Sequence, residues 1–196
     1  WSAHPEVAAL RDVRAERRVP VTAPLATYRL QFHKGFKFTD ATRLVPYLEK
    51  LGISHVYASP FLKARPGSTH GYDVVDHNQV NPEIGTQNDL KEFLDALKKH
   101  GMGMVVDLVP NHMGVGRADN QWWLDVLAWG EASPYAPFFD IRWQPLKRAL
   151  WGKVLLPFLG EHYGAVLENG ELELRFDRER GEFDVWYHEH RFPIRP

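Results

Sequence analysis

Three short apolar segments, separated by two amphipathic stretches, determine what the first half of this chain can fold into. Residues 25–32, 53–60 and 102–109 are rich in β-forming residues and are typical of strands. Residues 40–52 and 87–101 place apolar side chains at helical spacing, and each stretch carries a glycine at its end. The order strand, helix, strand, helix, strand predicts two βαβ units that share a strand, and therefore an α/β fold with a parallel sheet.

The third strand segment, MGMVVDLV (102–109), is apolar throughout apart from Asp107. We expect such a strand to be buried on both faces, as in parallel sheets that helices cover. Thr39 and Thr86 precede the two helical segments and are candidate N-caps. Residues 61–85 are polar and contain Gly and Pro, which predicts a long loop between the second strand and the second helix.

The glycine pattern disfavours a nucleotide-binding version of this fold. The first strand-to-helix turn lacks a Gly-x-Gly-x-x-Gly sequence, and the chain has no Gly-x-x-x-x-Gly-Lys sequence. The strand order itself is compatible with a doubly wound sheet or with a (β/α) barrel.

The chain changes character after residue 114. Residues 121–130 predict a short Trp-rich helix, and from 153 onward alternating segments separated by ENGE and RERGE predict a small antiparallel meander. We therefore divide the chain into three parts. An N-terminal helix and arm occupies 1–22, the βα units occupy 23–115, and an aromatic-rich helical segment with a small β subdomain, inserted after the third strand, occupies 116–196.

Composition argues against several classes of function. The 196-residue chain has a formal net charge of -1, so no basic excess favours nucleic-acid binding. Its apolar runs are too short to span a bilayer, and without cysteine it can form neither disulfides nor thiolate metal sites. The charged, amphipathic start of the chain does not resemble a signal peptide. We expect a cytoplasmic enzyme with no nucleic-acid or membrane partner.

Polar and aromatic residues gather where the three predicted strands end. They are Tyr28, Arg29 and Gln31 at the first, His70, Tyr72 and Asp73 after the second, and Asn111 and His112 after the third. Parallel strands deliver their carboxyl ends to one side, where barrel enzymes carry their functional groups. Amides, imidazoles and carboxylates bind hydroxyls, and a phenol ring covers the apolar face of a sugar, so the set favours a sugar site.

Each of these residues also has a purely structural interpretation. Asp107 would hydrogen-bond a neighbouring strand or pair with a buried arginine, and we favour such support over direct substrate contact. His112 alone would be a structural histidine and Tyr72 alone a packing residue, but Asn111–His112 after DLVP and the HGYD sequence favour binding. The ten histidines form no HExxH or other ligand spacing, so we expect no metal.

Longer phrases carry a family resemblance. DLVPNH (107–112) resembles the first signature block of the α-amylase superfamily, and HGYDVVDHNQVNPEIG (70–85) resembles the loop after that superfamily's second strand. Together with YRLQF (28–32) and HRFPI (190–194), they make nearly all of 24–196 resemble the maltooligosyltrehalose synthase family. The resemblance implies the first part of a (β/α)8 TIM barrel, about three βα units, with an α+β excursion after the third strand.

The resemblance also implies an activity. Enzymes of this family turn the reducing-end α-1,4 linkage of a maltooligosaccharide into an α,α-1,1 linkage by intramolecular transglucosylation, without a cofactor. Their nucleophile follows the fourth strand and their acid/base carboxylate the fifth, and neither phrase occurs here. We therefore expect an N-terminal portion that lacks the catalytic carboxylates, requires the remainder of the barrel, and is inactive alone.

Site roles follow from the matched positions. Tyr72 and His112 match groups that bind the sugar where the glucosyl bond breaks. Asp73 and Asp107 match residues that orient the site, Asp73 through an arginine later in the barrel. Asn111 matches a calcium ligand of many amylases, but this family is not expected to need calcium, so we assign it a hydrogen-bonding role in its loop.

Gln31 and His70 are two further candidate substrate contacts. Thr69-His70 stands where some exo-acting relatives have Asp-Asn, so the terminal-sugar contact of those relatives is not carried over. The aromatic residues of 122–151 are candidates for sealing or lining the pocket. Two alternative functions stay open: an α-glucan hydrolase of the same superfamily, and a non-catalytic carbohydrate-binding fragment.

Overall fold

A three-stranded parallel sheet organises the first half of the chain. The computed structural model describes residues 23–194, so the helix and arm expected at 1–22 lie outside the described residues. The sheet has the order β1-β2-β5, from β1 (Thr27–Leu30), β2 (His55–Ala58) and β5 (Gly103–Val106). Both neighbouring pairs run parallel in continuous register, which confirms the predicted strand order.

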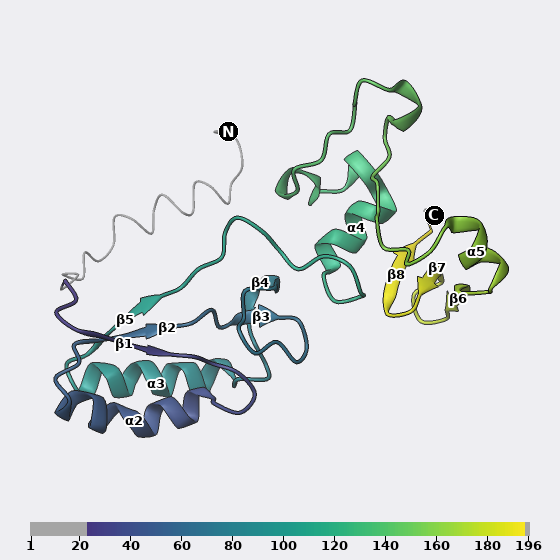
Figure 1. Cartoon of the computed structure of the whole chain (residues 1–196). Coiled ribbons are helices and arrows are strands. Elements are labelled where there is room, and N and C mark those ends of the chain that lie inside the picture. Colours follow the sequence, from purple (N-terminus) through teal and green to yellow (C-terminus); the bar gives the residue numbers. More distant parts are fainter. Residues whose placement is uncertain (1–22, 195–196) are drawn as a thin grey trace.

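Two helices cover one face of this sheet (Figure 1). They are α2 (Phe38–Lys50) and α3 (Gln87–Lys99). Thr86 caps α3 as predicted, because its hydroxyl accepts the Asp89 N–H at 3.1 Å. The start expected at Thr39 is wrong: α2 begins at Phe38, since the Asp40 carboxylate accepts the Lys37 backbone N–H at 2.8 Å and makes Lys37 the cap.

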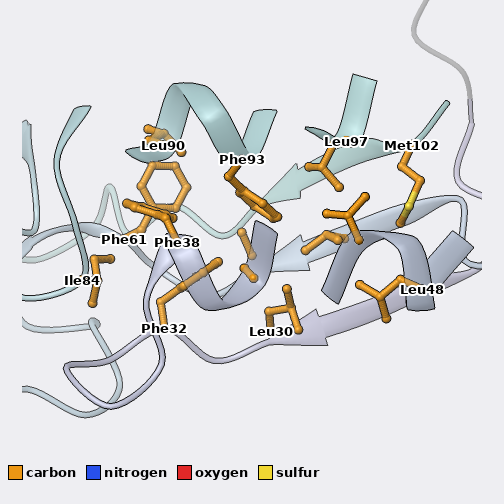
Figure 2. Packing of buried hydrophobic residues seen from close by; sticks show 14 residues of the cluster. Leu30, Phe32, Phe38, Leu48, Phe61, Ile84, Leu90, Phe93, Leu97 and Met102 are labelled. Atoms are coloured by element: carbon orange, nitrogen blue, oxygen red, sulfur yellow. The ribbon is translucent and has the colours of Figure 1, made fainter. Parts of the chain in front are cut away.

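The main hydrophobic core lies between the sheet and the two helices (Figure 2). Phe32, Phe38 and Phe93 form its aromatic centre, with ring centroids 5.0 to 6.4 Å apart. Leu30 and Ala58 contribute from the sheet and are buried. This packing of amphipathic helix faces onto alternate strand positions is what fixes the strands in the order seen.

The expectation that the third strand is buried on both faces is wrong for the described residues. Val106 at its end is 37% exposed, and the strand stops there. β5 lies at the edge of a three-stranded sheet, and the helices pack on one face only. Asp107 therefore follows the strand instead of interrupting it, with its N–H donating to the Ala58 carbonyl at 3.1 Å.

The segment expected to be a long loop contains a two-stranded antiparallel ribbon, β3 (Leu62–Ala64) with β4 (Val74–Val80). Gly71 makes the turn back toward the sheet, with a φ of 76°. A Cβ at this position would lie 2.4 Å from the Pro60 carbonyl oxygen, so only glycine fits. The ribbon thus fixes residues 70–73 beside the ends of the parallel strands.

The second half contains the predicted Trp-rich helix, α4 (Gln121–Trp129), and the predicted meander. The meander is β6 (Leu172–Asp177), β7 (Glu182–Tyr187) and β8 (His190–Pro193), in that order. Three short 3-10 turns, η1 (Gly130–Ala132), η2 (Ala136–Phe138) and η3 (Arg148–Leu150), and the helix α5 (Tyr163–Glu168) lie between them and were not predicted. Among the described helices, none combines the length and apolarity that crossing a bilayer demands.

Phe93→Ala should destabilise the fold strongly. Phe93 is fully buried among other aromatic rings, and truncating such a residue leaves a cavity that typically costs about 3–5 kcal/mol. Urea unfolding should therefore show a large fall in midpoint at unchanged slope. Leu94→Ala is the matched control on the same helix, because Leu94 is 40% exposed; equal losses for both variants would contradict this assignment of the core.

Candidate functional site

A cluster of polar side chains occupies the sheet face that the helices leave uncovered. Arg29 and Tyr57 are partners in the register of β1 and β2. They alternate with Leu30 and Ala58, which are buried beneath the helices, so their side chains point to the opposite face. Asp107 joins them from the end of β5.

The Asp107 carboxylate is the centre of this cluster. Its Oδ2 accepts hydrogen bonds from the Tyr72 hydroxyl at 2.6 Å and from the Tyr57 hydroxyl at 3.0 Å. Arg29 Nη1 donates to the same oxygen at 3.3 Å. One carboxylate therefore joins β1, β2, β5 and the loop between β3 and β4.

Arg29 extends the network beyond Asp107. Its Nη2 donates to Gln31 Oε1 at 3.2 Å and to the Tyr72 hydroxyl at 3.1 Å, while its guanidinium lies 4.9 Å from the centre of the Tyr57 ring. Gln31 in turn donates through Nε2 to the backbone carbonyls of residues 69 and 70 at 3.3 Å. Gln31 thereby holds the loop that carries Tyr72.

These contacts set the charge state of the cluster. The hydrogen bond from Tyr72 lowers the pKa of Asp107 below its ordinary value. Burial opposes this with the next-largest effect, and the bonds from Tyr57 and Arg29 add to the lowering. The bond to Tyr72 raises the pKa of Arg29, and the bond to Asp107 raises the pKa of Tyr57. At neutral pH the carboxylate is ionised and the Tyr57 hydroxyl keeps its proton.

Tyr72 presents its ring at the surface while its hydroxyl is held by Asp107. The residue is 37% exposed. The His70 ring lies nearly parallel to it, with centroids 6.1 Å apart, and His70 Nδ1 accepts the Tyr72 N–H at 3.0 Å. In neutral His70 the proton is therefore on Nε2, which can donate.

His112 lies against the same loop. Its Nε2 donates to the Tyr72 carbonyl at 2.9 Å, since a carbonyl oxygen can only accept, and its Nδ1 lies 3.2 Å from Asn111 Oδ1. Two residues on, the Gly114 N–H donates to the Val74 carbonyl at 2.7 Å. The loop after β5 is thus fastened to the loop before β4.

Asp73 turns away from the cluster. Its carboxylate accepts the Ser68 hydroxyl at 2.5 Å and has His70 Nδ1 at 3.9 Å. Among residues 23–194, Ser68 and His70 are the partners of its side chain, and the arginine partner implied by the family resemblance is not among them.

The structure therefore brings six of the seven residues to which the sequence analysis gave a site role into one cluster, with Asp73 beside it. These six are Gln31, His70, Tyr72, Asp107, Asn111 and His112. Sequence reasoning gave Tyr57 no role and noted Arg29 only for its place near a strand end. Their position in register, opposite to the buried residues of the same strands, is the signal that would have found both.

One groove borders this network. Its volume is about 440 Å3, its lining includes Asn111, His112 and aromatic residues of 122–139, and Tyr72 is not in its lining. A larger groove, of about 710 Å3, lies within residues 115–155, has a mainly apolar wall and contains no residue of the network in its lining. In residues 23–194, His, Asp and Glu side chains form no group of three that could ligate a metal ion.

Asp107→Asn should make stability less sensitive to acid. A carboxylate with a depressed folded-state pKa stabilises the fold above its unfolded-state pKa of about 3.9, and this contribution is lost as the pH falls through the folded-state value. Wild type should therefore lose stability more steeply than Asp107→Asn between about pH 5 and pH 2, as followed by urea midpoints at each pH.

Asp95→Asn provides the matched control. Asp95 is an exposed carboxylate on α3 whose side chain accepts from Lys91 at 2.7 Å. This variant leaves the Asp107 cluster intact, so the steep loss of stability between about pH 5 and pH 2 should persist in it. If Asp107→Asn followed the wild-type curve as closely, Asp107 would not be the stabilised carboxylate described above.

Comparison with known proteins agrees with this geometry. The family of α-amylase catalytic domains matches residues 41–166. A putative maltooligosyl trehalose synthase of Mycobacterium tuberculosis is 47% identical over 142 residues, which are 69% of this chain and 18% of the relative. A maltogenic α-amylase of Bacillus acidopullulyticus is 38% identical over 102 residues, 52% of this chain and 17% of the relative.

Solved structures give the same relationship. The maltooligosyltrehalose synthase of Arthrobacter ramosus superposes with a TM-score of 0.74 at 45% identity, covering 88% of this chain and 21% of that one. The chain thus spans about a fifth of the length of these relatives. The resemblance noted from the sequence is confirmed by both comparisons: the chain belongs to the family of α-amylase catalytic domains and, within it, is similar to maltooligosyltrehalose synthases.

Proposed function

We propose that this chain belongs to an enzyme that isomerises maltooligosaccharides to maltooligosyltrehaloses. The residues at the ends of its three parallel strands would form one part of the active site. The observation that carries the proposal is the 45% identity and 0.74 TM-score with a maltooligosyltrehalose synthase over 88% of the chain. The three parallel strands would be the first three of an eight-stranded barrel, and residues 116–196 would be a subdomain inserted after the third.

The proposed reaction is a double displacement at one anomeric carbon. The α-1,4 bond to the reducing-end glucose breaks, the anomeric carbon bonds to a carboxylate nucleophile, and an acid/base carboxylate protonates the leaving 4-hydroxyl. The freed glucose then attacks through its own anomeric hydroxyl, whose proton returns to the base. Two inversions retain the α configuration and give an α,α-1,1 linkage.

Asp107 does not act as the nucleophile in this proposal. Its Oδ2 already accepts three hydrogen bonds, and its lowered pKa marks a carboxylate stabilised by its neighbours. It supports the site by holding Tyr72 and Arg29. The nucleophile and the acid/base would come from residues beyond those of this chain.

The residues beside Asp107 would contact the sugar. The exposed ring of Tyr72 would cover the apolar face of the glucosyl ring. His112 Nδ1, which keeps its lone pair while Nε2 donates to the Tyr72 carbonyl, would accept from one hydroxyl, and His70 Nε2 would donate to another. Gln31 would act mainly by holding the loop that carries Tyr72, through the carbonyls of residues 69 and 70. Asn111 would offer its amide beside His112, in the loop after β5. Asp73 would fix the shape of the HGYD turn.

A hydrolytic α-glucan enzyme is the second candidate, because the chain is also 38% identical to a maltogenic α-amylase over 102 residues. Incubating the complete natural gene product with maltopentaose separates the two. The proposal requires the reducing-end signal to disappear without release of shorter sugars. Reducing oligosaccharides as the sole products would establish the hydrolase, and binding without any turnover would favour a carbohydrate-binding protein.

His112→Ala in the complete gene product should reduce kcat/KM by a factor equivalent to roughly 2–4 kcal/mol, as expected for a strong polar contact to the transition state. Tyr72→Ala should also lower turnover strongly, because stacking and the hydrogen bond to Asp107 are both lost. Steady-state kinetics on maltopentaose measure both effects.

His100→Ala is the matched control for these substitutions. His100 follows α3 and pairs with Glu49 of α2 at 2.7 Å, away from the strand ends that carry the site. It should keep wild-type kcat/KM at pH 7. If His112→Ala behaved like His100→Ala, His112 would have to be removed from the proposed sugar contacts.

A further inference from the structure

The groove of about 440 Å3 beside His112 has two unlike walls. One wall comes from the strand-end region and includes His77, Asn111 and His112. The other comes from the aromatic segment and includes Trp122, Phe138 and Asp140. The volume lies within the range of roughly 300–1,000 Å3 that is usual for small-molecule clefts.

The aromatic wall is a built platform. The Trp122 ring stacks on Tyr135, with centroids 5.1 Å apart and planes at 12°, and it contacts Phe138 at 5.0 Å. Phe138 is nevertheless 65% exposed. An aromatic ring that is supported from behind and open in front is suited to stacking against a flat ligand face.

Asn120 holds this platform in place relative to His112. Its buried side chain donates to the Gly114 carbonyl at 2.9 Å and accepts the Trp123 N–H at 3.0 Å. The first contact ties it to the loop that carries His112, and the second caps α4, which carries Trp122. The two walls of the groove are therefore joined by one amide.

The chemistry of the lining selects among ligands. The ten described residues around the groove include no Lys or Arg, which disfavours phosphate or another anion. Asp140 and Asn111 are exposed and offer oxygens that accept hydrogen bonds from hydroxyls. Exposed acceptors beside an aromatic face fit a pyranose ring, which has apolar faces and a rim of hydroxyls.

We infer that this groove binds glucosyl units of the α-glucan next to the unit held by Tyr72 and His112, with Phe138 as the stacking residue and Asp140 and Asn111 as hydroxyl acceptors. The inference rests on the proposed function, because the groove would bind further glucosyl units of the same α-glucan substrate. His112 belongs to both places, which makes the groove continuous with the candidate site.

The test is the dependence on substrate length in the complete natural gene product. Phe138→Ala should raise KM for maltoheptaose about 3- to 10-fold more than KM for maltotetraose, because stacking by one ring is worth a factor of this size. Phe138→Trp should restore the wild-type dependence on length, since it keeps an aromatic face. A uniform rise at both lengths, no rise at either, or a failure of Phe138→Trp to rescue would overturn the inference.

Phe176→Ala is the matched control. Phe176 is 52% exposed and packs on Phe183 at 4.8 Å in the meander, outside the lining of the groove. It should keep the wild-type KM at both lengths. If Phe138→Ala lowered Tm without any length-dependent change in KM, Phe138 would be a packing residue on Trp122 and the inference would be overturned.

Calorimetric titration with maltoheptaose and maltotetraose separates this inference from the proposed function. One outcome is binding that depends on sugar length and is weakened by Phe138→Ala, in a protein that forms no non-reducing product. It would support sugar binding in the groove and contradict the isomerase proposal. The opposite outcome is isomerisation together with binding that Phe138→Ala leaves unchanged at both lengths. It would support the isomerase proposal and contradict sugar binding in the groove.

Discussion

The carboxylate of Asp107 is the constraint on which the candidate site depends. Its Oδ2 receives hydrogen bonds from Arg29, Tyr57 and Tyr72, which lie on two strands and a loop far apart in the sequence. An ionised acceptor with several donors is strongly stabilised as an anion, and each donor loses freedom in return. The ring of Tyr72 is therefore oriented before any sugar arrives, so binding need not order it.

The layout of the sheet and helices was predictable because it depends on local patterns. The spacing of Leu90, Phe93 and Leu97 and the cap at Thr86 define α3 within one segment of chain. The β3–β4 ribbon was not predictable in this way, because β3 has only three residues and pairs with β4 through register shifts. Such pairing is stabilised by contacts with the rest of the fold and leaves little periodicity in the sequence.

The sequence predicts which residues share the candidate site when they follow the ends of neighbouring parallel strands. Placing Tyr72 and His112 in adjacent loops follows from parallel strands alone, and the distance of 2.9 Å between His112 Nε2 and the Tyr72 carbonyl agrees with it. The roles of Arg29 and Tyr57 depend on the side of the sheet on which their side chains lie. A shift of strand register by one residue would place those side chains on the opposite side. The local turning of Asp73 toward Ser68 depends on side-chain geometry that no pattern in the sequence encodes.

The double anchoring of Gly114 and Asn120 has a consequence for how this chain can vary. Gly114 is bonded through its N–H to Val74 and through its carbonyl to Asn120, so the intervening connection is tied at both ends. Insertions or deletions there would change the spacing between the strand ends and the aromatic platform. The turn at residues 178–181 is exposed, and its hydrogen bonds go to Asp177 within the same hairpin, so its length does not set the spacing of distant parts. Among relatives, loop-length variation should accumulate in the meander and avoid the segment between 114 and 120.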